Sequence, residues 1–93
     1  MPSINAIRKV LESEQLVDEL AAVEHERWAH WQRYVHDRCD RQQDGSLVIP
    51  ADLAARWEAQ IETRYVELTE REKDSDREQV RRYLPVIIDA VTR

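Results

Sequence analysis

The longest helical pattern of the chain lies in residues 14–38, which read EQLVDELAAVEHERWAHWQRYVHDR. Apolar side chains recur there at helical spacing, at Leu16, Leu20, Val23, Trp31, Tyr34 and Val35. Ser13 directly precedes the pattern and can cap the first turn, and Glu14 suits the positive end of the helix dipole. The sequence therefore predicts one long amphipathic helix over residues 14–38.

The segments on either side predict a short helix, a loop and a second long helix. Ser3 can cap a short helix over residues 4–11, which carries an apolar stripe of its own. Residues 39–49 contain an Asp-Gly-Ser turn signal and are expected to form the loop. Pro50 then suits the first turn of a second long helix, which we expect to end near residues 65–66.

A third long helix is predicted to run to about Val91. It begins at a capping box, in which the Thr69 hydroxyl accepts from the amide of Glu72 and the Glu72 carboxylate reaches back. Pro85 lies inside this helix and lacks the amide hydrogen, so we expect a kink or a break there. The side chains expected to point inward are Val80, Leu84, Ile87, Ile88 and Val91.

Length and composition bound the fold class. A chain of 93 residues forms one domain with a modest core, and we take residues 1–93 as a single unit. The helical patterns make the fold all-α, a small bundle of three long helices plus a short N-terminal helix. Cys39 is the one cysteine, so no disulfide can form within the chain.

Charge and hydropathy exclude two classes of partner. The net charge is −5, with 14 basic and 19 acidic residues, which argues against binding of polymeric nucleic acid. No apolar run of membrane-spanning length occurs, and the N-terminal residues do not resemble a signal peptide. We therefore expect a soluble protein of the cytoplasm that does not bind membranes.

Several cations fall on the apolar arcs of the long helices when residues are placed about 100° apart. They are Arg27 on the first helix, Arg64 on the second, and Lys73 with Arg77 on the third. A buried charge without a partner costs several kcal/mol, so each must be compensated. One solution lies within the chain: the cations pair with its carboxylates, or their long side chains extend to water at the edge of the core. The candidate internal partners are Glu24, Glu62, Glu70 and Glu72. The other solution is an anionic ligand held by the cations, with Trp or Tyr rings stacking a base.

No residue pattern indicates catalysis or a metal site. Glu26 and His30 have the i,i+4 spacing that a metal can use, but no third ligand follows at a suitable spacing. Cys39 has His36 nearby, but no Gly-rich turn accompanies it. We expect neither an enzyme nor a cofactor.

Two stretches resemble the ryanodine-receptor repeat domain. Residues 20–29, LAAVEHERWA, resemble its Leu-Ala-x-x-x-His-x-x-Trp-Ala helix. Residues 65–77, YVELTEREKDSDR, resemble its second signature, Tyr-x-x-Leu-Thr-x-x-Glu-Lys-x-x-Asp-Arg. The two occur in the family's order, and the chain looks like a stand-alone bacterial or phage-type member. The Gly-Trp-x-Tyr-Gly turn and the His-Pro pair of the family are absent, and residues 50–64 take their place.

The resemblance implies a helical module without catalysis that binds small nucleotide-derived molecules, including ADP-ribose-like signals. Because receptor repeats occur as tandem pairs, it also implies that a lone repeat forms a homodimer. In a phage, such a protein would act as a sponge that sequesters an immune second messenger. The family's marked residues fall on His25, Trp28, Tyr65, Glu72, Lys73, Asp76 and Arg77.

We therefore expect non-catalytic binding of a small anionic, nucleotide-like ligand. The residues expected to hold its phosphates are Arg27, Arg64, Lys73 and Arg77, and those expected to stack its base are Trp28, Trp31 or Tyr65. The alternative is a protein–protein interaction module whose internal charges pair with one another. A third interpretation, a small hydrolase acting on the same ligand, is disfavoured because the sequence offers neither a nucleophile nor a set of metal ligands.

Overall fold

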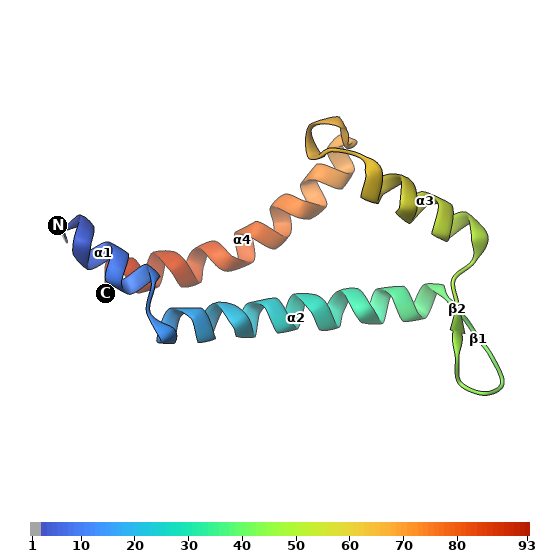
Figure 1. Ribbon diagram of the computed structural model, residues 1–93, viewed down its shortest axis with the longest axis horizontal. Coiled ribbons are helices and arrows are strands. Elements are labelled where there is room, and N and C mark those ends of the chain that lie inside the picture. Colours follow the sequence, from blue (N-terminus) through green and yellow to red (C-terminus); the bar gives the residue numbers. More distant parts are fainter. Residues whose placement is uncertain (1–2) are drawn as a thin grey trace.

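The computed structural model describes residues 3–93, and the chain is mostly helical, as the sequence predicts (Figure 1). Its elements in chain order are α1 (Ile4–Leu11), α2 (Glu14–Arg38), β1 (Asp40–Arg41), β2 (Leu47–Val48), α3 (Ala51–Glu62), a 3-10 turn (Tyr65–Glu67) and α4 (Glu70–Thr92). Residues 1–2, the start of the predicted single domain, lie outside the described residues.

The first two helices begin at the predicted caps. The Ser3 hydroxyl accepts a hydrogen bond of 3.1 Å from the amide of Ala6, and α1 follows. The Ser13 hydroxyl accepts one of 3.2 Å from the amide of Leu16, and α2 follows. Each serine satisfies an amide that would otherwise lack a partner in the first turn, so the predicted bounds 4–11 and 14–38 are confirmed.

The predicted loop turns tightly and carries a small sheet. Its two-residue strands β1 and β2 pair in antiparallel register. Gly45 has φ +91°, a conformation that other residues rarely adopt. The Asp44 carboxylate accepts from the amide and the hydroxyl of Ser46, at 2.9 and 2.6 Å, and these bonds lower the pKa of Asp44. Strands of two residues are too short to show the alternation that predicts a strand.

Helix α3 is shorter than predicted. It ends at Glu62, and the predicted end at residues 65–66 was wrong, because Thr63 and Arg64 are both extended. The Thr63 hydroxyl donates to the carbonyl of Ala59 at 2.7 Å and thereby occupies an acceptor of the last turn. The chain then makes the 3-10 turn before α4.

Helix α4 begins at the predicted capping box. The amide of Thr69 donates to the Glu72 carboxylate at 3.0 Å, and the amide of Glu72 donates to the Thr69 hydroxyl at 3.2 Å. The helix continues through Pro85 to Thr92, so of the expected kink or break, the break does not occur. Pro85 removes only one helical hydrogen bond, and the Arg81 carbonyl that loses it belongs to an exposed residue that water can reach.

The helices form an open V rather than enclosing a common core. In Figure 1, α2 and α4 meet near α1 and diverge toward the far end, where α3 connects them. Within the described residues only Leu16 and Ala90 are buried. The radius of gyration is 18.2 Å, whereas a compact domain of this length has a value of about 12 Å.

The apolar column of α4, formed by Val80, Leu84 and Ile88, is largely exposed. Val80, Leu84 and Ile88 have 54%, 43% and 56% of their surface exposed, so the prediction that they point inward was wrong. Ile87 and Val91 are half-buried. Within residues 3–93, no helix is long and apolar enough to cross a bilayer.

Candidate functional site

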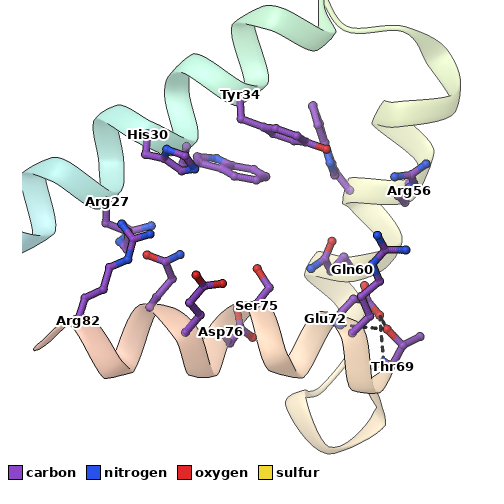
Figure 2. A pocket seen from close by; sticks show the side chains of 15 residues that line it. Arg27, His30, Tyr34, Arg56, Gln60, Thr69, Glu72, Ser75, Asp76 and Arg82 are labelled. Atoms are coloured by element: carbon purple, nitrogen blue, oxygen red, sulfur yellow. Dashed lines mark hydrogen bonds between the residues drawn. The ribbon is translucent and has the colours of Figure 1, made fainter. Parts of the chain in front are cut away.

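An open cavity of about 860 Å³ lies between α2, α3 and α4, and Figure 2 shows its lining. Helix α2 contributes cavity-lining residues from Arg27 to Tyr34, and α3 contributes residues from Arg56 to Gln60. Helix α4 contributes a polar face that begins at the Thr69 cap. The cavity therefore occupies the space where the two arms of the V separate.

Three aromatic rings form one wall of the cavity. The rings of Trp31 and Tyr34 stack with centroids 5.5 Å apart and an interplanar angle of 24°. The edge of Trp57 meets Trp31 at 6.0 Å and 60°, which joins α3 to α2. Because Trp31 and Tyr34 keep 44% and 36% of their surface exposed, their ring atoms remain accessible from the cavity. Such a wall can stack a planar ring of a ligand.

Four arginines line the cavity, and three of them have no ion pair within residues 3–93. Arg27 pairs with Glu24, whereas Arg56, Arg71 and Arg82 have no carboxylate partner there. In Figure 2 the side chains of Arg27 from α2 and Arg82 from α4 reach toward each other. The Glu24 carboxylate already answers the charge of Arg27, whereas Arg82 has no such partner in the described residues, and its guanidinium fork fits phosphate and carboxylate oxygens.

Acidic residues temper this positive charge. Glu72, Asp76 and Glu78 also line the cavity, so the arginines exceed the carboxylates by one. Glu72 is engaged in the capping box, where the backbone amide and the hydroxyl of Thr69 lower its pKa. The buried Oε1 of Gln79 also lies in the lining, and it has no hydrogen-bond partner in the described part of the chain. Because the atom has almost no accessible surface, the side chain must turn before a donor of a ligand in the cavity can satisfy it.

At the edge of the cavity, Glu24 links the two arms of the V. Its carboxylate accepts from Nε of Arg27 at 3.0 and 3.1 Å and from the Tyr83 hydroxyl of α4. The Arg27 guanidinium, aided by that hydroxyl, lowers the pKa of Glu24 to about 2. The Glu24 carboxylate in turn raises the pKa of Arg27 and of Tyr83. The predicted pairing of Glu24 with Arg27 is thus present.

Of the predicted ligand-binding residues, Arg27 and Trp31 line the cavity. Tyr65, Lys73 and Arg77 come together elsewhere, around Glu70 at the beginning of α4. Lys73 Nζ lies 5.8 Å from the centroid of the Tyr65 ring and 3.6 Å from the Glu70 carboxylate. Arg77 donates to Glu70 at 3.2 Å and to Asp74 at 2.8 Å, and these bonds raise its pKa. The predicted internal pairing therefore exists for both cations.

The two remaining predicted residues lie outside both groups. Trp28 is 51% exposed and stacks on His25 with centroids 6.0 Å apart. Arg64 pairs with Glu67 at 2.9 Å, and its side chain is 77% exposed. The prediction that Arg64 points inward was wrong, because α3 ends before that residue and the helical projection no longer applies.

Sequence reasoning missed most of the cavity lining, including Arg56, Arg71, Arg82, Tyr34, Trp57 and Gln79. Helical periodicity predicts the apolar column of α4 as its inner face, whereas the cavity is lined by a polar stripe on another face of that helix. This stripe was visible in the sequence as polar residues at helical spacing, Glu72, Asp76, Gln79 and Arg82. Whether this polar stripe faces the rest of the chain depends on the positions of α2 and α3, which the residue pattern of one helix does not reveal.

Comparison of the chain with protein-family models, with curated proteins and with solved structures found no match, so its function is inferred from the geometry above and the sequence patterns.

Proposed function

We propose that the cavity binds a small anionic ligand that carries a planar ring, and that it does so without catalysis. The chemical class is a nucleotide-derived molecule, such as ADP-ribose or a cyclic-nucleotide-like second messenger. The observation that carries the proposal is the convergence of Arg27 and Arg82 in a cavity with an aromatic wall. Arg56 and Arg71 supply two further cations without an ion pair in the described residues.

Size and chemistry both support this class of ligand. Small-molecule sites span roughly 300–1,000 Å³ and combine apolar walls with a few polar groups, and the cavity of about 860 Å³ falls within that range. A phosphate between guanidinium groups makes charge-assisted hydrogen bonds, which are about twice as strong as neutral ones. A base on Trp31 or Tyr34 would gain stacking energy, while Gln79 would accept one donor from the ligand.

We further propose that the chain is a stand-alone member of the ryanodine-receptor repeat family. The support is its two signature stretches, residues 20–29 on α2 and residues 65–77 across the 3-10 turn and the start of α4. In a phage, stoichiometric binding without turnover would make the protein a sponge for a signalling nucleotide. The compact bundle of three long helices is part of the same proposal, because a ligand that bridges Arg27 and Arg82 would draw α2 and α4 together.

Titration calorimetry of the purified protein tests the binding. The panel is pyrophosphate, AMP, ADP-ribose, cyclic ADP-ribose and NAD, each followed by chromatography to show whether the ligand stays intact. We expect one phosphate-bearing class to bind and to be recovered unchanged. Slow conversion of the ligand would reject the non-catalytic role, and a flat response to every phosphate compound would reject the proposed ligand class.

Arg81 and Arg82 provide a matched pair for locating the site. Both are exposed arginines of α4, but only Arg82 lines the cavity. Arg82→Gln should weaken binding roughly 10- to 100-fold, since a hydrogen bond to a charged group contributes about 1.5–3 kcal/mol. Arg81→Gln removes the same charge outside the cavity and should leave the affinity nearly unchanged. Equal losses in both variants would mean that binding follows overall charge rather than this cavity.

A protein–protein interaction module is the second candidate function. It is favoured by the internal pairing of Arg27, Lys73 and Arg77, which leaves these cations without need of a ligand. It is favoured as well by the large apolar side chains that the chain leaves exposed, notably on α4. The Arg82→Gln experiment separates the two candidate functions. An interaction module binds no small anionic ligand, so neither wild type nor Arg82→Gln should bind one.

A further inference from the structure

The outer face of α4 has the residue spacing of a coiled coil. Residues at alternating steps of four and three form one line, which we name the α4 seam: Lys73, Arg77, Val80, Leu84, Ile87 and Val91. This is the heptad spacing that keeps side chains facing a partner helix. Val80 and Leu84 are exposed, and so is Ile88 beside them. In the single chain the seam is therefore uncovered at Val80 and Leu84 and half-buried at Ile87 and Val91.

The chain exposes far more surface than its mass accounts for. Its accessible surface is 7796 Å². A compact monomer of 11.1 kDa exposes about 5,700 Å², so the excess is about 2,100 Å² per chain. Two chains that each covered that excess would bury about 4,000 Å² together, which falls within the roughly 2,000–5,000 Å² of obligate dimer interfaces. The excess surface is thus large enough to include an obligate dimer interface, and the rest of it lines the open cavity.

We propose that the α4 seam is a homodimer interface in which the α4 helices of two copies pack antiparallel. In this register Val80 lies against Val91 of the partner subunit, and Leu84 lies against Ile87 of the partner subunit. The four central layers are then entirely apolar, and a twofold axis passes between positions 85 and 86. The two α4 helices and the α2 helices beside them would form a four-helix assembly with the core that one chain lacks.

Charge decides the antiparallel direction. A parallel pair would place Lys73 and Arg77 against the same cations of the other copy, and such like-charge contacts are unfavourable. In the proposed antiparallel register, residues 70–77 extend past the end of the partner helix, so Lys73 and Arg77 meet no cation of the other copy. Glu78 lies at the level of Arg93 of the partner subunit, and Arg82 lies at the level of Asp89 of the partner subunit, so the charges that flank the seam are opposite. The helix dipoles also oppose each other in this arrangement.

The seam and the cavity use different faces of α4. None of the seam residues lines the cavity, and the cavity residues Asp76, Gln79 and Arg82 do not belong to the seam. Each copy in the dimer would keep its own cavity. Dimerisation therefore stands or falls separately from ligand binding, and its tests need no ligand.

Sedimentation velocity of the full chain, across a hundredfold range of concentration, is the first test. We expect a species with the mass of two chains that dissociates on dilution. Leu84→Glu should abolish that species, whereas Ile61→Glu should leave it intact, because Ile61 is 78% exposed on α3, away from the seam. A helical wild-type chain that stays monomeric at every concentration would overturn the proposal. Equal loss of the dimer in both variants would overturn it as well.

Disulfide trapping tests the register and does not depend on the folding of a charged variant. In a Cys39→Ser background, Leu84→Cys and Ile87→Cys should form a mixed disulfide when the two proteins are combined and oxidised. Each alone should cross-link far less, since the same position does not meet itself. Preferential cross-linking of Leu84→Cys with itself would indicate a parallel pair, and no cross-link in any mixture would place the interface elsewhere. Either result would overturn the proposed dimer.

Discussion

The carboxylate of Glu24 is one of the polar links between the two long helices, beside the ion pair of Glu19 with Arg93. Glu24 accepts from Arg27 on its own helix and from Tyr83 on α4, and Arg27 is the larger cause of its lowered pKa. Because only Leu16 and Ala90 are buried in the described residues, polar contacts between the arms carry an unusual share of the tertiary structure. Such a contact is sensitive to pH and to salt.

The lowered pKa of Glu24 predicts an acid-dependent stability. The folded pKa of about 2 lies below the ordinary value of 4.5. The contribution is therefore present above about pH 4.5 and is lost as the pH falls toward 2. Melting temperatures of wild type and Glu24→Gln, followed by circular dichroism from pH 2 to 7, should differ most near neutrality and converge near pH 2. Glu26 has no ion pair in residues 3–93, so the melting temperature of Glu26→Gln should differ from that of wild type by the same amount at every pH. A melting-temperature difference for Glu24→Gln that is equally constant with pH would contradict the role of Glu24.

A substitution at Gln79 should change the stability of the protein and its ligand affinity in opposite directions. Its Oε1 is buried without a partner within residues 3–93, which costs free energy in the unliganded protein. Gln79→Met should therefore raise the free energy of unfolding by about 1 kcal/mol while it weakens ligand binding. Urea denaturation and calorimetry on the same samples measure both quantities. A variant that is destabilised would show that the amide makes contacts that stabilise the fold.

At the scale of elements, the capping box defines where α4 begins. The Thr69 hydroxyl accepts from the amide of Glu72. Thr69→Ala should lower the free energy of unfolding by about 1 kcal/mol. Thr92→Ala, at the other end of the same helix, removes a hydroxyl that bonds the carbonyl of Ile88 and should cost less. Urea titration of both variants measures the difference, and a Thr92→Ala loss as large as that of Thr69→Ala would contradict it.

Pro85 should be a destabilising residue within α4. Since the helix runs continuously through it, an alanine there restores a backbone donor for the Arg81 carbonyl. Proline in a helix interior is about 3 kcal/mol less favourable than alanine, so Pro85→Ala should raise the melting temperature while the helical signal in circular dichroism stays the same. A lower melting temperature would mean that the proline shapes the helix for the dimer seam.

Local signals predicted the helices, but not how the helices face one another. Ser3, Ser13 and Thr69 are caps that act within one turn, and the predicted starts of α1, α2 and α4 agree with the structure. The direction of a face requires the position of other elements. The apolar column through Leu84 was read as the inside of one chain, although the chain leaves it uncovered. Arg82, in turn, reads as an ordinary surface residue until Arg27 is seen opposite it.

At the scale of the whole molecule, the buried residues of the described part of the chain lie at one end of the V. Leu16 and Ala90 are buried where α1, α2 and α4 meet, whereas α3 at the far end contains no buried residue. Opening of a segment costs little where few apolar contacts must be broken. The far end of the V should therefore unfold much more readily than the closed end.

Hydrogen exchange measured by mass spectrometry makes this distribution visible and separates the two proposals. In the dilute free protein, peptides around Leu16 and Ala90 should exchange slowest and peptides of α3 fastest. A higher protein concentration should add protection along residues 77–91 of α4, because the seam is then covered. A cavity ligand should protect α3 and residues 27–34 of α2, and in α4 and its cap it should protect residues 69–82 but not residues 83–91. If concentration and ligand protected the same peptides, the seam and the cavity would not be independent surfaces, and uniform exchange along the dilute chain would contradict the closed-end core.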